Sequence, residues 1–182
     1  MTPASGPPPY IIETLERRHD RKAFSCGQAD LDRYLKQQAR QDTQRRVAAT
    51  FVALERGQVV IVGYYSLSAT IVPLRDLPPQ TAARLPRYPL LPATLLGRLA
   101  VDRKHQGRKL GEFLLADALQ RSLAQSGEIG SMAVIVDAID DRARSFYEHF
   151  QFIAFPDQPR RLFLPMESIA GLFGHKTPPT KR

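Results

Sequence analysis

Hydrophobic residues in the first third of the chain recur at the spacing of one helix face. Asp30, a residue type that caps helix N-termini, precedes apolar residues at Leu31, Tyr34, Leu35 and Ala39. The cations of this segment are left mostly toward solvent: Arg33, Lys36, Arg40, Arg45 and Arg46. The pattern predicts an amphipathic helix with a basic face, which on its own is either an ordinary solvated surface or a binding surface.

Two runs rich in β-branched and aromatic residues follow, at residues 49–54 and 59–72. Their short polar connection at residues 55–58 predicts an antiparallel hairpin. Residues 73–92 then hold six prolines and no sustained period. We therefore expect an irregular segment there, with a short helix at residues 80–85.

The remaining pattern alternates strands and helices. Strands are predicted at residues 95–101 and 132–138, and each leads into a helix, at residues 108–125 and 141–150. Residues 161–165 predict a last strand. The order indicates an α/β (α+β) domain, with a mixed, mostly antiparallel central sheet and helices on both faces.

Length and composition fit one compact domain, because the chain has 182 residues and is 43% hydrophobic. We place this domain at residues 10–170, between a Pro, Gly and Ser-rich tail at 1–9 and a basic tail at 171–182. Cys26 is the only cysteine, so no intramolecular disulfide can form. The longest apolar stretch, residues 59–69, is shorter than the about 20 residues that span a bilayer. We expect a cytoplasmic protein with no membrane partner.

The net charge of +8 and the pI of about 10.0 favour polyanionic partners. Charge alone does not decide, since many soluble domains are basic without binding nucleic acid. Its placement is more informative, because besides the first helix a second cationic group comprises Arg75, Arg84, Arg87 and Arg98.

The segment at residues 99–111 joins a strand to a helix through a basic turn. Unpaired backbone N–H groups at a helix N-terminus point at any anion placed there, and the helix dipole adds partial positive charge. Gly107 and Gly111 have no side chain to hold a phosphate away. Four cations lie nearby: Arg103, Lys104, Arg108 and Lys109. Spacing alone fits either a pyrophosphate site or a plain basic connection.

Residues 106–111 resemble the Q/R-x-x-G-x-G/A motif of the GNAT acetyltransferase superfamily, with Lys109 in place of the middle glycine. The resemblance implies that acetyl-CoA is the cosubstrate and that the amides of this loop hold its pyrophosphate. It further implies that the main chain of the preceding strand pairs with the pantetheine arm and faces the thioester carbonyl. The implied cofactor-binding residues are Leu99, Ala100, Val101, Gln106, Gly107, Arg108, Lys109, Leu110 and Gly111.

A second run, residues 143–152, resembles the A-x-x-F-Y-x-x-x-G-F run of the same superfamily, with Gln151 where glycine is usual. It implies that Tyr147 protonates the departing coenzyme A thiolate and that Phe146 contacts the cofactor. The alternative for Tyr147 is a core aromatic role beside Phe146 and Phe150. Glu148 and His149 are alternative proton carriers, and His105 is expected at the surface of the turn.

Residues 24–27, 31–35, 96–102 and 162–166 resemble the acetyltransferase toxins of bacterial type II toxin-antitoxin modules. The resemblance covers residues 11–169 and implies acetylation of the free amino group of aminoacyl-tRNA, which blocks translation. It also implies neutralisation by a ribbon-helix-helix antitoxin and a homodimeric state. Basic residues would then contact the tRNA acceptor: Arg33, Lys36, Arg40 and Arg98.

Two other functions remain open. An acetyltransferase for a protein or small-molecule amine keeps Tyr147 and the turn but leaves the basic helix unexplained. A noncatalytic nucleic-acid-binding module keeps the charge but gives the turn no role. We reject Cys26 as a nucleophile, and no spacing of Cys, His, Asp or Glu predicts a metal site.

Overall fold

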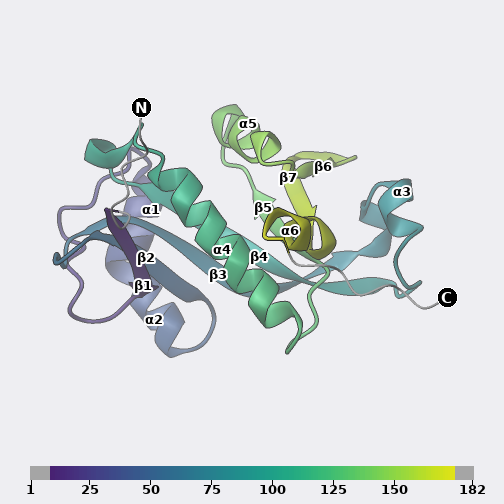
Figure 1. Ribbon diagram of the computed structural model, residues 1–182, viewed down its shortest axis with the longest axis horizontal. Coiled ribbons are helices and arrows are strands. Elements are labelled where there is room, and N and C mark those ends of the chain that lie inside the picture. Colours follow the sequence, from purple (N-terminus) through teal and green to yellow (C-terminus); the bar gives the residue numbers. More distant parts are fainter. Residues whose placement is uncertain (1–8, 175–182) are drawn as a thin grey trace. The chain divides into compact units, whose positions relative to one another are not determined.

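The computed structural model describes residues 9–174 and orders seven strands into one sheet, β1-β2-β3-β4-β5-β7-β6 (Figure 1). The predicted tails fall mostly outside these residues, and α6 continues to Leu172, past the boundary expected at 170. By its contacts the chain groups into two compact units. The first comprises the described residues up to Ser66 together with Arg98–Asp117, and the second comprises Leu67–Gly97 and the described residues from Ala118.

In the first unit, β1 (Tyr10–Thr14) pairs antiparallel with β2 (Ala49–Glu55). The next strand in the sheet, β3 (Ile61–Pro73), follows β2 through a turn at Gly57, whose φ of 78° suits glycine. The end of β4 (Leu90–Val101) completes this part. The strands at 49–54 and 59–72 are confirmed, whereas the first strand was not predicted.

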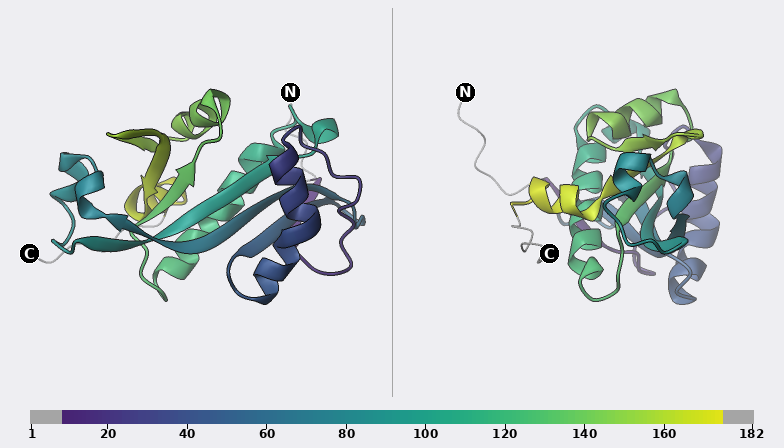
Figure 2. Two further views of the ribbon diagram at one scale, coloured as in Figure 1. Left: turned by 180° about the vertical axis from the view of Figure 1, so that it is seen from behind. Right: turned by 90° about the vertical axis from the view of Figure 1, so that its right-hand side faces the viewer.

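Helices cover both faces of the sheet in the first unit, as the opposite views of Figures 1 and 2 show. On one face lie α1 (Ala29–Arg33), a π-helical segment η1 (Tyr34–Gln38) and α2 (Ala39–Gln44). Tyr34, Leu35 and Ala39 pack there with Tyr64 of β3 in one buried cluster. On the other face α4 (Leu110–Ser126) begins against Gly63.

Gly63 is required for that close approach. A Cβ at this position would lie 3.0 Å from Leu114 Cδ1 and 3.3 Å from the Ala100 carbonyl oxygen. Successive strand residues face opposite sides of a sheet, so Tyr64 points at the first helix while its neighbour Gly63 faces α4. The glycine thereby sets how closely the start of α4, and the turn before it, sit on the sheet.

In the second unit, β4 pairs parallel with β5 (Ala133–Asp137), and β5 pairs antiparallel with β7 (Gln158–Pro165). The short β6 (Ile153–Phe155) pairs with β7. Four consecutive residues of β5, 133–136, are fully buried, as expected for a strand covered on both faces. The unit also holds α3 (Pro79–Ala82), α5 (Asp141–His149), α6 (Met166–Leu172) and a 3-10 turn at Leu74–Asp76. A further 3-10 turn, Arg103–His105, belongs to the first unit.

Three sequence expectations are corrected. Asp30 is not the N-cap of the first helix, because Gln28 holds that position without a side-chain cap bond. That helix is also not uniform, since the Ala39 amide donates to the carbonyl of Tyr34, five residues earlier. The irregular segment expected over 73–92 ends early, because β4 begins at Leu90 and includes Pro92, whose carbonyl accepts from Met132.

Candidate functional site

The turn between β4 and α4 is built on the carboxylate of Asp102, which is 9% exposed. One oxygen accepts from the Lys104 amide at 3.0 Å and shapes the 3-10 turn Arg103–His105. The other accepts from the Ser25 amide, also at 3.0 Å. The Asp102 amide also donates a hydrogen bond to the Val62 carbonyl of β3 at 2.9 Å. One carboxylate therefore fixes the turn to both the sheet and the segment before α1.

The side chain of Gln106 stabilises the turn, a role that the motif does not predict. Its side-chain nitrogen donates to the carbonyl oxygens of Val101 and Cys26, each at 3.0 Å. The side chain therefore closes the turn from within, and the group left to face an anion is its backbone. Sequence reasoning could not find this role, because Cys26 lies 80 residues away in the chain.

The backbone that follows Gln106 takes an anion-binding conformation. Gly107 has φ 77° and Lys109 has φ 62°, so two left-handed residues flank Arg108 just before α4 begins. Alternating right- and left-handed residues turn successive N–H groups into a concave cradle for anions. The first turn of α4 adds N–H groups without intrahelical partners, and four cations lie close to it in the sequence.

Lys109 therefore replaces the motif glycine while keeping a conformation that glycine favours. Among the residues that the structure describes, only Arg46, Lys109 and Gln151 have positive φ without being glycine. Lys109 and Gln151 are the two positions at which this chain departs from the glycines of the two motifs. Both residues take a left-handed conformation that glycine adopts more easily, at a conformational cost of roughly 1 kcal/mol each.

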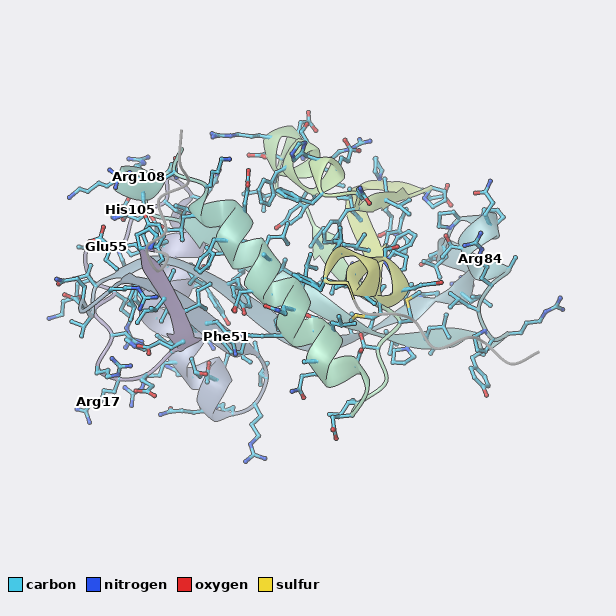
Figure 3. All side chains as sticks on the ribbon, viewed as in Figure 1. Arg17, Phe51, Glu55, Arg84, His105 and Arg108 are labelled. Atoms are coloured by element: carbon cyan, nitrogen blue, oxygen red, sulfur yellow. The ribbon has the colours of Figure 1, made fainter. Side chains whose placement is uncertain are left out.

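His105 is not the surface residue that the sequence indicated. Its side chain is 15% exposed, Nε2 lies 3.1 Å from Glu55 Oε1, and its ring packs edge-on to Tyr10. Figure 3 shows this pair on the same end of the first unit as Arg108, which extends outward. Because Glu55 ends β2 and Tyr10 begins β1, His105 anchors the turn to the far edge of the sheet.

The basic residues of the first helix differ in their surroundings. Lys36 is exposed and Arg40 is half-buried. Arg33 is exposed and pairs with Asp30 at 3.2 Å, a surface ion pair that contributes little. Arg98 of β4 packs instead over the ring of Tyr34, whose hydroxyl donates to Asp42 at 3.0 Å. Arg98 therefore lies directly on the first helix.

Tyr147 is held in place by the end of α5. The Phe152 amide donates to the Tyr147 carbonyl and the Gln151 amide donates to the Glu148 carbonyl, with Gln151 left-handed at φ 68°. This is a Schellman motif, and the ring contact of Tyr147 with Phe152 at 5.3 Å is its usual apolar closure. At the other end, Asp140 caps α5 by accepting from the Ala143 amide at 2.7 Å. Hydrogen bonds local to α5 thus fix the tyrosine backbone.

Tyr147 lies in a buried and aromatic environment. The residue is 8% exposed, and its ring packs edge-on to that of Phe146 at 5.2 Å. Burial raises the pKa of the phenol well above its ordinary value, so the hydroxyl stays protonated at physiological pH. Glu148 and His149, the alternative carriers, are both exposed.

The other predicted residues lie as follows. Ala100 is buried in the cluster with Tyr64, while Leu99 and Val101 are half-buried at the end of β4. Leu110 is buried and Gly111 half-buried in the first turn of α4. The functional residues that sequence reasoning missed are Asp102 and Ser25.

Cys26 is unsuited to nucleophilic chemistry. Burial, together with a hydrogen bond to Asp32, raises the pKa of its thiol to about 11, so the thiolate is scarce at neutral pH. Within residues 9–174, no cluster of three or more His, Cys, Asp or Glu side chains could hold a metal ion. No helix in the same range is long and apolar enough to cross a membrane.

Comparison with known proteins agrees with this geometry. Residues 46–154 match the acetyltransferase (GNAT) domain family. The chain is 39% identical to the "tRNA-acetylating toxin" of Mycobacterium tuberculosis over 155 residues, which cover 85% of this chain and 91% of that protein. The family resemblance predicted from residues 106–111 and 143–152 is confirmed.

Two solved structures extend the comparison. The toxin AtaT complexed with acetyl-methionyl-tRNAfMet superposes with a TM-score of 0.84 at 27% identity, covering 90% of this chain and 99% of that one. A tyrosine-to-phenylalanine mutant of AtaT, bound to the C-terminus of the antitoxin AtaR and acetyl-CoA, gives 0.77 at 25% identity, covering 91% and 99%. The predicted fold class is confirmed.

Proposed function

The chain belongs to the GNAT acetyltransferase family, and we propose that it is a toxin that transfers the acetyl group of acetyl-CoA to the free amino group of aminoacyl-tRNA. Its relative from Mycobacterium tuberculosis is named for tRNA acetylation, and AtaT is known in complex with an acetylated aminoacyl-tRNA. Acetylation removes the nucleophilic amine that peptide bond formation needs, so translation stops.

The observation that carries the proposal is the turn with left-handed residues at Gly107 and Lys109. Its N–H groups, the first turn of α4 and the neighbouring cations fit a pyrophosphate, as acetyl-CoA requires. The acetyl-CoA bound in AtaT supports the same assignment. When bound, acetyl-CoA supplies the activated acetyl group. The chain's own residues bind and orient the two substrates and transfer protons.

The acceptor amine needs little activation. An α-amino group has a pKa of about 8, so a useful fraction is neutral at physiological pH without a strong base. The remaining need is a proton for the departing thiolate, which we assign to Tyr147 at the tyrosine position of the second motif. Because transfer from a phenol to a thiolate is uphill, the positioning of the two groups must assist it. The amides at residues 99–101 are assigned to the pantetheine arm and the thioester carbonyl.

The basic surface is assigned to the acceptor. Exposed Arg33 and Lys36, with Arg40 nearby on the same helix, present cations to the tRNA backbone, and Arg98 adjoins them through Tyr34. An acetyltransferase for small amines would have no use for this surface. As partners we propose a ribbon-helix-helix antitoxin and a second copy of the chain. We place the protein in the cytoplasm, where charged tRNA is used.

Incubation of the protein with acetyl-CoA and total charged tRNA tests the proposal. We expect acetylated aminoacyl groups, identified by mass after nuclease digestion, and no product with uncharged tRNA. Parallel reactions offer a protein amine and a polyamine. Acetylation of these amines without acetylation of charged tRNA would replace the proposal with the small-amine alternative, and absence of any acetyl transfer would contradict the enzymatic function itself.

A further inference from the structure

Both backbone groups of Cys26, its amide and its carbonyl, are hydrogen-bonded to side chains of other segments. Its amide donates to Asp32 Oδ1 at 2.9 Å, and its carbonyl accepts from Gln106 Nε2 at 3.0 Å. Asp32 belongs to α1, and Gln106 belongs to the turn that precedes α4. The first helix, which begins with α1 and is here called the acceptor helix, is therefore joined to the turn before α4, here called the cofactor turn, through the backbone of one residue.

The segment around this residue is firmly seated on the turn. The Arg103 amide donates to the Ser25 carbonyl at 2.9 Å, and the Asp102 carboxylate accepts from the Ser25 amide at 3.0 Å. The Arg103 guanidinium lies against Gly27, where an added Cβ would come 3.3 Å from Nε. Because Gly27 has φ 96°, a side chain there would be strained as well as crowded.

We propose that Asp32 and Gln106 are positioning residues that hold the acceptor helix in register with the cofactor turn through the Cys26 backbone. The inference rests on the proposed function, since it assigns the helix to the tRNA acceptor. Other contacts tie the same helix to the sheet, namely the Tyr64 hydroxyl to the Leu31 carbonyl at 2.7 Å and Arg98 over Tyr34. Among these contacts, the Cys26 link is the one in which a side chain of the helix and a side chain of the turn meet on a single residue.

The link predicts a separation of kinetic effects. Asp32→Ala removes the acceptor of the Cys26 amide without touching the turn, so acetyl-CoA affinity should stay within about twofold. The acceptor KM should rise about tenfold, within the roughly 5- to 150-fold range of couplings between sites. Asp32→Asn keeps a carbonyl oxygen for the Cys26 amide and should recover most of the acceptor affinity. Asp30→Ala removes the same charge from the same helix and serves as the matched control, since Asp30 pairs only with exposed Arg33 among the described residues.

Hydrogen exchange gives a readout that needs no tRNA. Adding acetyl-CoA to the wild type should increase the protection of the amides at residues 29–44, because ordering of the turn is passed through Cys26. In Asp32→Ala that gain should disappear while acetyl-CoA still binds by calorimetry. Should Asp32→Ala fail to fold, Asp32→Ser, whose hydroxyl is too short to reach the amide, is measured in its place.

The outcomes separate the proposals. An acceptor KM unchanged in Asp32→Ala, an undiminished protection gain, or an Asn variant as impaired as the Ala variant would each overturn the positioning role. A wild type that binds acetyl-CoA and protects the helix but acetylates no charged tRNA would instead contradict the proposed function, with the link itself intact.

Discussion

The guanidinium carbon of Arg98 lies 3.5 Å from the ring centroid of Tyr34, so a cation of β4 stacks directly on the first helix. A planar guanidinium can stack in this way while its edge N–H groups remain available to an acceptor, whereas a lysine ammonium cannot. The same cation opposes the rise in the pKa of Tyr34 that burial and Asp42 cause.

Replacement of Arg98 by lysine should therefore cost stability although the charge is kept. We expect a loss of about 0.5 kcal/mol in the free energy of unfolding, a part of the cation–π range, because a lysine keeps some of the attraction but not the planar stacking. Urea denaturation measures it. Arg33→Lys is the control, because Arg33 pairs with Asp30 and its exposed ion pair should contribute little. Equal effects of the two substitutions would contradict a stabilising role for the stacking.

The left-handed conformation of Gln151 predicts that glycine is the better residue there. Gln151→Gly should raise the free energy of unfolding by about 1 kcal/mol, because it relieves a conformation that costs non-glycine residues roughly that much. Thermal denaturation checks the change. Gln151→Ala also removes the side chain but leaves the strain, so it should not stabilise; an alanine variant as stable as the glycine variant would refute the conformational explanation.

Local patterns predicted much of this architecture, and the limits of that prediction follow a physical rule. The predictions of the strand at residues 49–54, of helix α5 and of the two sequence motifs all depend on residues within a few positions of one another. The burial of His105 depends on Glu55, 50 residues away, and the task of Gln106 depends on Cys26, 80 residues away. Spacing along the chain contains no signal for such contacts.

Some local features also escaped prediction. Strand β1 has no alternation clear enough to separate it from its surroundings, and its pairing with β2 supplies the order. The π-helical segment does not alter the apolar pattern of Tyr34, Leu35 and Ala39, all of which are buried as expected. In the sequence Asp102 looks like an ordinary polar residue of a turn. Its hydrogen bond from the Ser25 amide, 77 residues earlier, shows that it joins the turn to the segment before α1.

The exposed cations of the first helix predict a salt-dependent reaction. In the Arg33→Glu, Lys36→Glu variant the acceptor KM should rise at low salt, while acetyl-CoA affinity changes less. Removal of one cation that neutralises a phosphate should reduce the slope of log affinity against log salt by about 1, so the double variant should show a slope smaller by about 2. Steady-state kinetics at several salt concentrations measure this slope.

A single exposed residue of another segment provides the control for that experiment. Arg17→Glu makes the same kind of charge change on the connection after β1 (Figure 3). If it altered the salt slope by about 1, the change expected for each of the two helix cations, the effect would come from net charge and the helix would not be the acceptor surface.

The raised pKa of Cys26 predicts low reactivity in the folded protein. Since burial shifts the thiol pKa upward to about 11, the native thiolate fraction grows only as pH approaches that value. An unfolded thiol, with a pKa of about 8.5, ionises much earlier. At pH 7.5 iodoacetamide should therefore modify the native chain at a rate lower by about tenfold or more than that of the urea-unfolded chain. Comparable rates in the two states would show that the thiol is neither buried nor shifted.

Tyr147 allows the sharpest separation of chemistry from structure. Tyr147→Phe removes one hydroxyl and keeps the ring contacts with Phe146 and Phe152, so the Schellman end of α5 and the fold should survive. Because general acid catalysis contributes about 10²- to 10⁴-fold, turnover should fall by that factor while acetyl-CoA affinity stays near wild type, and toxicity in growing cells should disappear. Tyr147→Ala is the contrasting variant, since it loses the packing and should also lower the melting temperature. Near wild-type turnover in Tyr147→Phe would pass the acid role to His149, Glu148 or a bound water.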